Sequence, residues 1–146
     1  MKRYSSATIV LLAVAAVFGV QGCQVSPQAA RPAGLVEDPC AARLHDLAGG
    51  LLAYYAAHGR LPEDLRGLRS AAGADALPPC VCPVSGKPYV YCKDGVKASG
   101  HAGLVVLYDA TPAHEGAAWG IAMETPAGGG PVTAQVVRLA ELPASP

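Results

Sequence analysis

The chain has 146 residues, a formal net charge of zero and 51% hydrophobic residues. This length leaves room for one domain beside a targeting segment. A nearly neutral chain lacks the electrostatic footprint of nucleic-acid-binding proteins, so we expect no nucleic-acid partner. Alanine dominates the hydrophobic fraction, which predicts a thin core that depends on covalent crosslinks more than most cores do.

Residues 1–22 have the pattern of a secretory signal peptide. Lys2 and Arg3 precede an uncharged run over 7–20, and Gly22 supplies a small residue before Cys23. These features are the charged region, the apolar region and the cleavage site of such a signal. The apolar run is shorter than the roughly 20 residues that cross a bilayer. We therefore predict cleavage, with a short uncleaved anchor helix as the alternative.

The sequence Val20-Gln21-Gly22-Cys23 resembles the lipobox of bacterial lipoproteins. The resemblance implies that the signal is cut before Cys23 and that the cysteine carries acyl chains such as palmitate. Each methylene buried in a membrane contributes about 0.8 kcal/mol. The mature protein would thus be anchored to a membrane of the bacterial cell envelope without spanning it. The domain would face the periplasm or the exterior.

A flexible tether and a long helix are predicted next. Residues 23–37 contain prolines and a glycine without apolar periodicity, which is typical of a tether. Asp38 is predicted to cap a helix over 39–58 that has Pro39 at its first position and ends at Gly59. Its apolar stripe consists of Leu44, Leu47, Leu51, Tyr54 and Tyr55, which recur at helical spacing.

The rest of the domain, which we place at 38–141, is predicted to be a sheet. A short second helix over 61–68 has Pro62 and two acids in its first turn. Short connections between consecutive strands favour an antiparallel sheet covered by the long helix, an α+β fold. The tail at 142–146 is expected to be disordered. The four predicted strands are 88–92, 103–109, 118–124 and 132–139.

Two motifs resemble the periplasmic domains of type II secretion pseudopilins. They are the helix end over 54–62 (YYAAHGRLP) and the strand start over 86–91 (GKPYVY). The match covers residues 39–124, and it implies a pseudopilin-like domain in a protein linked to a type II secretion-like system. The sequence lacks the acidic calcium loop and the continuous hydrophobic helix of filament-forming pseudopilins. The resemblance therefore implies the fold and not filament assembly.

Four cysteines follow the signal peptide: Cys40, Cys80, Cys82 and Cys92. Export favours disulfides, and a Cys80–Cys82 ring would be strained. We predict that one of these two bonds Cys92 and the other bonds Cys40, which the chain-entropy treatment values at about 4 kcal/mol. Zinc bound by all four cysteines is the rival interpretation, but their spacing fits zinc knuckles poorly. We accordingly predict neither a metal nor a cofactor.

No catalytic signature stands out, so we predict no catalytic residue and no enzyme activity. Ser85 lacks the flanking residues of a nucleophile elbow or a phosphate loop. His114 and Glu115 are adjacent in a turn, where a solvated or hydrogen-bonded histidine is the simpler interpretation. The rival hypothesis is a small metal-dependent or hydrolytic envelope enzyme that uses His114, Glu115 and the cysteines. We expect instead a structural or protein-interaction role, with another envelope protein as partner.

Overall fold

The structure is a computed structural model that describes residues 38–73, 75–128 and 130–144. The predicted signal peptide, the lipidation site Cys23 and the tether lie outside these residues. In this part of the chain, no helix is long and apolar enough to cross a membrane. The elements are α1 (Pro39–His58), α2 (Leu65–Ala72), β1 (Val90–Val96), β2 (Leu104–Tyr108), β3 (Ala118–Glu124) and β4 (Thr133–Leu139).

Helix α1 begins and ends where the sequence predicts. The Asp38 carboxylate accepts hydrogen bonds from the backbone N–H groups of Cys40 and Ala41, at 2.8 and 3.3 Å. Gly59 adopts a left-handed φ of 68° and donates its N–H to the Tyr55 carbonyl. The buried face of α1 consists of Cys40, Ala41, Leu44, Leu47, Ala48 and Leu51.

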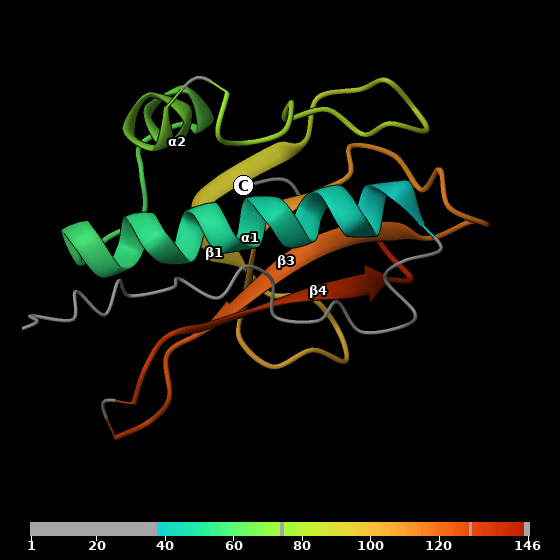
Figure 1. Ribbon diagram of the computed structural model, residues 1–146. Coiled ribbons are helices and arrows are strands. Elements are labelled where there is room, and N and C mark those ends of the chain that lie inside the picture. The colour runs from blue at the N-terminus through green and yellow to red at the C-terminus, as the bar shows by residue number, and fades with distance from the viewer. Residues whose placement is uncertain (1–37, 74, 129, 145–146) are drawn as a thin grey trace, which may run out of the picture.

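The four strands form one antiparallel sheet in the order β1-β2-β3-β4. Figure 1 shows α1 lying along this sheet, next to β3 and β4. The predicted α+β architecture is therefore confirmed: a long helix, a short second helix and a four-stranded antiparallel sheet. Strand β3 has its predicted bounds, whereas β2 and β4 are shorter than predicted by one residue at one or both ends.

Helix α2 begins later than the sequence analysis predicts. It starts at Leu65 and not at residue 61, because Asp64 is its cap and accepts the Gly67 N–H at 2.7 Å. Pro62 lies before the helix and is buried, and its carbonyl accepts the Tyr91 hydroxyl at 2.7 Å. The proline therefore joins the helical layer to β1 instead of opening a helix.

Strand β1 is also displaced from its predicted position over 88–92. It runs from Val90 to Val96, because the preceding residues pair with a different segment. The Lys87 carbonyl and the Tyr89 N–H bond backbone groups in the segment 80–82, at 2.8 and 3.1 Å. A small hairpin thus precedes β1, and it contains Cys80 and Cys82.

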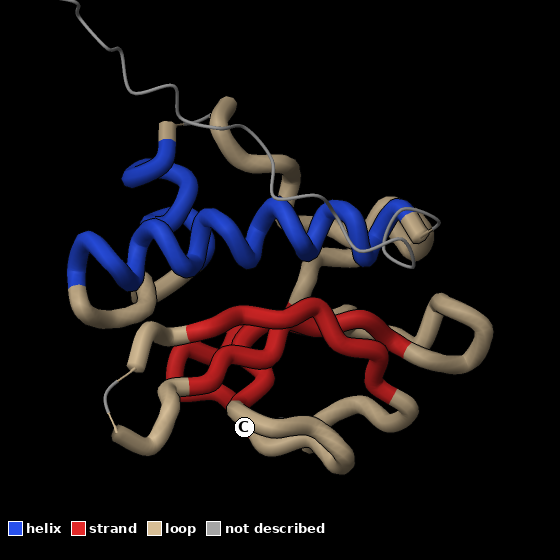
Figure 2. The backbone as a smooth tube through the Cα atoms, turned by 60° about the horizontal axis from the view of Figure 1, so that its bottom comes forward, coloured by secondary structure: helices blue, strands red, loops and turns tan. Residues whose placement is uncertain are grey.

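The sheet buries side chains on both of its faces. One cluster lies between α1 and the sheet, and a second contains Cys92, Val105, Tyr108 and Leu139. Figure 2 shows both helices on one side of the sheet and loops on the other. Since Tyr91 packs against the first cluster and Cys92 belongs to the second, the Cys92 side chain faces away from α1.

A close backbone approach at the start of β2 can be tested with two glycines. A Cβ added to Gly103, whose φ is 80°, would overlap the Met123 carbonyl oxygen and lie 2.9 Å from its carbon. Gly100 has a φ of 79° but open space around it. Both changes to alanine carry the left-handed backbone cost of about 1–2 kcal/mol, and only the first adds a clash.

We expect Gly103→Ala to lower the free energy of unfolding by about 1–3 kcal/mol more than Gly100→Ala, because the backbone has to shift to admit the methyl group. Urea denaturation of the two variants measures this difference. Equal losses of unfolding free energy in the two variants would contradict the close packing of the start of β2 against the end of β3.

Candidate functional site

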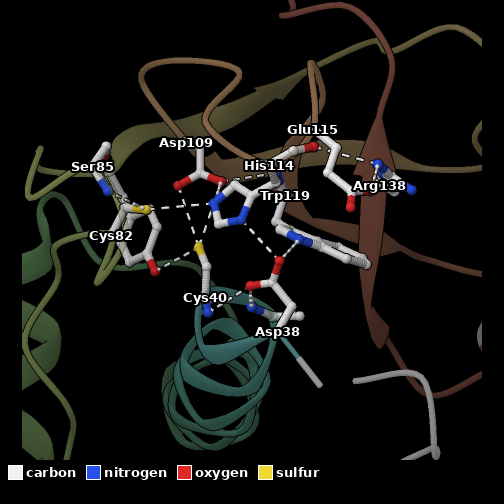
Figure 3. Close-up of polar contacts among 11 residues, drawn as sticks. Asp38, Cys40, Cys82, Ser85, Asp109, His114, Glu115, Trp119 and Arg138 are labelled. Carbon is white, nitrogen blue, oxygen red and sulfur yellow. Dashed lines mark hydrogen bonds and ion pairs between the residues drawn. The ribbon is translucent and has the colours of Figure 1, made fainter. Parts of the chain in front are cut away.

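Four side chains from distant parts of the sequence meet at the N-terminal end of α1. They are Cys40 in α1, Cys82 in the hairpin before β1, Asp109 just after β2, and His114 in the turn between β2 and β3. Their exposed fractions are 0%, 1%, 0% and 7%, respectively. One ligand atom of each lies within 4.8 Å of the others. Figure 3 shows the four side chains pointing toward one another, and we call them the Cys/Asp/His cluster.

The hairpin at residues 82–87 positions the Cys82 sulfur. The Cys82 N–H donates to the Lys87 carbonyl at 2.8 Å, and the Gly86 N–H donates to the Cys82 carbonyl at 2.9 Å. Gly86 has a φ of 69°, which a glycine adopts without strain. The Ser85 N–H points at the Cys82 sulfur, 3.4 Å away. Ser85, which the sequence analysis considered as a nucleophile, thus contributes its backbone to this site.

Asp109 and His114 are positioned by the connection between β2 and β3. The Trp119 N–H donates to Asp109 Oδ2 at 2.8 Å, which orients the carboxylate. His114 and Ala117 exchange two backbone hydrogen bonds of 3.0 Å across a tight turn. Glu115 and Gly116 occupy this turn with positive φ angles of 52° and 78°, as in a type I′ hairpin. The turn therefore directs the His114 ring back toward α1.

The His114 ring is held from both sides. Its Nδ1 lies 2.8 Å from Asp38 Oδ2, the carboxylate that also caps α1. Its Nε2 lies 3.2 Å from Asp109 Oδ2 and 3.5 Å from the Cys82 sulfur. Because Asp38 is an acceptor, it favours a proton on Nδ1 and leaves Nε2 directed into the cluster.

Burial and hydrogen bonding set the charges around the cluster. Burial raises the pKa of the Cys40 thiol, and Asp109 raises it further despite an opposing effect of Tyr89. Burial also raises the pKa of Tyr89, whose hydroxyl lies 3.1 Å from the Cys40 sulfur. Burial by itself would raise the pKa of Asp38, but hydrogen bonds, chiefly from the Trp119 indole, lower it below its ordinary value. Without a cation, the Cys40 thiol is therefore neutral, whereas Asp38 carries a carboxylate that bonds the Cys40 backbone N–H.

The cluster has the side chains of a closed metal site. Two sulfurs, one imidazole and one carboxylate are ligand types that zinc accepts, and four protein ligands without an open position are typical of structural zinc sites. All four side chains are buried, so a substrate has no direct access to them. Among the described residues, every buried side-chain nitrogen and oxygen has a hydrogen-bond partner. This geometry suits a site that stabilises the fold better than it suits a catalytic site.

The cysteine pairing predicted from the sequence is not formed in the structure. Cys40, Cys80, Cys82 and Cys92 are all free thiols. Cys92 lies on the far face of the sheet, in a different side-chain cluster from Cys40 and Cys82. Cys80 is partly exposed and lies outside the Cys/Asp/His cluster. The structure therefore brings together two of the four cysteines, and their neighbours are Asp109 and His114.

The enzyme hypothesis uses His114 and Glu115, and these two side chains leave their turn in different directions. His114 enters the cluster, whereas Glu115 lies 3.3 Å from Arg138 on the surface. Sequence reasoning found His114 and the cysteines but missed Asp109 as their neighbour. Its position as the last residue of the strand predicted over 103–109 was the available signal. Asp109 comes close to Cys40 only because the connection between β2 and β3 packs over the start of α1.

Comparison with known proteins adds nothing to this geometry. No family model matches the chain, and neither the curated proteins nor the solved structures yielded a match.

Asp38 and Asp64 form a matched pair for testing how the cluster is supported. Asp64 caps α2 and otherwise forms only an exposed ion pair with Arg66, at 3.4 Å, which contributes little to stability. Asp38 caps α1 and also accepts from His114 and from the Trp119 indole N–H, both at 2.8 Å. We expect Asp64→Ala to cost about 1 kcal/mol of unfolding free energy. Asp38→Ala should cost about 1–3 kcal/mol more for each partner that it leaves unbonded.

Chemical denaturation of both variants, together with Asp38→Asn, separates the two roles of Asp38. Asparagine is as good a cap as aspartate, so a loss in Asp38→Asn reports on His114 and Trp119 alone. Similar losses for Asp38→Ala and Asp64→Ala would show that the contacts to the β2–β3 connection contribute nothing.

Proposed function

We propose that this chain is a lipid-anchored protein of the bacterial cell envelope with a structural or protein-binding role. One observation carries the non-catalytic part of this proposal. The cysteine, aspartate and histidine side chains that the fold brings together, in the Cys/Asp/His cluster, are buried against one another and have no direct access to a substrate. An active site needs at least one such group within reach of a bound substrate.

The anchor part of the proposal depends on the sequence before the domain. Val20-Gln21-Gly22-Cys23 has the pattern of a lipidation site, and the described domain starts at Asp38. Residues 24–37 separate the two, and a fully extended chain of that length reaches about 50 Å. The domain would thus stand close above the membrane surface, where its partners would be other envelope proteins.

A relation to type II secretion pseudopilins is the finer part of the proposal. A long helix on an antiparallel sheet, with the two short motifs at 54–62 and 86–91, supports it. Asp38 caps α1 at its own start, so the helix does not need a preceding hydrophobic segment to begin. The proposed role is therefore that of a single anchored subunit that contacts a secretion-like assembly, without forming a filament itself.

A hydrolytic or metal-dependent enzyme is less well supported. Its proposed pair, His114 and Glu115, diverges at the hairpin turn, and Glu115 contacts Arg138 instead. His114 Nε2 faces Asp109 and Cys82 in the buried cluster. No water-filled position next to the ring is needed to satisfy its two nitrogens.

Removal of the lipid site tests the proposal. We expect Cys23→Ser to abolish incorporation of a palmitate analogue and to shift the protein from the membrane fraction to the soluble fraction, because the acyl chains supply the membrane affinity. The matched control is Cys80→Ser, which changes a cysteine within the domain and should leave both readouts unchanged. An unacylated Cys23→Ser protein that stays in the membrane fraction would overturn the anchor.

A further inference from the structure

We propose that Cys40, Cys82, Asp109 and His114 bind one zinc ion, which fastens the start of α1 to the hairpin before β1 and to the β2–β3 turn. This inference goes beyond the proposed envelope role and is independent of the lipid anchor. It assigns one specific ligand, a zinc ion, to the Cys/Asp/His cluster. The site would be structural, with four protein ligands.

The spacing of the ligand atoms supports a tetrahedral ion. Zinc holds sulfur at about 2.3 Å and nitrogen or oxygen at about 2.0–2.2 Å, so its ligand atoms lie about 3.3–3.8 Å from one another. His114 Nε2 lies 3.5 Å from the Cys82 sulfur and 3.2 Å from Asp109 Oδ2. The Cys40 sulfur lies 3.5 Å from the same Asp109 oxygen. Three edges of the cluster thus already approach the dimensions of a zinc tetrahedron.

Each ligand also has a partner that orients it. His114 Nδ1 bonds Asp38, an arrangement that commonly positions a metal-binding histidine. The Trp119 N–H donates to Asp109, and the Ser85 N–H approaches the Cys82 sulfur. The Tyr89 hydroxyl lies 3.1 Å from the Cys40 sulfur. Donors therefore face both sulfurs and the carboxylate, as anionic ligands require.

The chemistry of the ligands selects the class of metal. Calcium and magnesium bind oxygen almost exclusively, so two sulfurs argue against them. A closed set of two sulfurs, one imidazole and one carboxylate suits zinc. On binding, the Cys40 and Cys82 thiols each lose a proton to solvent and form zinc–sulfur bonds, without any change of oxidation state. The ion would offset two of the three buried negative charges.

The alternative state of the cluster is a hydrogen-bonded one without metal. Cys40 would then donate its S–H to Asp109 Oδ1, at 3.3 Å, and the His114 ring would lie between the Asp38 and Asp109 carboxylates. A third state is a disulfide between Cys40 and Cys82, whose sulfurs lie within 4.8 Å of each other. The three states differ in metal content and in the number of titratable thiols.

Metal analysis of the full chain, expressed with its signal and purified in detergent, is the first test. We expect one zinc per chain by inductively coupled plasma mass spectrometry. Cys82→Ser should lower this content at least tenfold, because it removes a ligand, whereas Cys80→Ser should retain it. A wild-type protein without metal that also fails to bind added zinc would overturn the site. So would equal zinc in the wild type and in Cys82→Ser.

Cobalt substitution of the wild type keeps the test decisive if Cys82→Ser does not fold. Cobalt in this site should show the visible bands of tetrahedral coordination and the near-ultraviolet bands of two thiolate ligands. Absence of the thiolate bands, or a Cys40–Cys82 disulfide in mass mapping of the untreated protein, would refute the proposal. Neither result would affect the membrane fractionation that tests the anchor.

Asp38 would be a positioning residue for this site, since it contacts His114 and not the ion. Loss of such a contact typically lowers metal affinity about 10- to 100-fold. We expect this decrease for Asp38→Ala in a competition titration with a chromogenic zinc chelator. Asp64→Ala, which removes the cap of α2 and an exposed ion pair with Arg66, should bind zinc as the wild type does. Unchanged affinity in Asp38→Ala would refute the orientation of His114 by Asp38.

Discussion

The carboxylate of Asp38 connects the start of the long helix to the turn between β2 and β3 and to the start of β3. One oxygen caps α1 through two backbone N–H groups, and the other accepts from His114 and from the Trp119 indole. A helix cap is a local interaction, whereas the contact with His114 joins residues 76 positions apart in the sequence. The beginning of α1 is therefore determined by the same side chain that docks the β2–β3 turn against it.

Two residues of the Cys/Asp/His cluster, Cys40 and Cys82, belong to the core between α1 and the sheet. Much of the interface between α1 and the sheet is made by leucines and alanines, and Phe18, the one phenylalanine of the chain, precedes the domain. The cluster joins α1, the hairpin before β1 and the β2–β3 turn at one end of this interface. A crosslink there would restrain three segments that are far apart in sequence, and it would thereby stabilise the folded domain.

Zinc and disulfides are competing uses of the same sulfur atoms. A thiolate that binds zinc is not available for a disulfide, and the exported location that we propose would favour oxidation of any thiol that is not protected. Burial protects Cys40 and Cys82, and hydrogen-bond donors face both sulfurs. Cys92 is separated from them by the sheet itself, since its side chain lies on the other face. The structure thus separates the pair of cysteines in the cluster from Cys80 and Cys92, the other two cysteines of the described domain.

The sequence by itself determined the elements whose signals are local. The cap at Asp38, the stop at Gly59 and the bounds of β3 follow from capping residues and periodicity, and the structure agrees. The starts of α2 and β1 were predicted less well, because Asp64 outweighs the helix-start signal of Pro62, and because the residues before Val90 pair with the segment 80–82. Only the tertiary structure decided that Cys40, Cys82, Asp109 and His114 meet, and that Cys92 does not join them. The physical reason is that their proximity depends on how a turn packs over a helix end, and no local propensity encodes that packing.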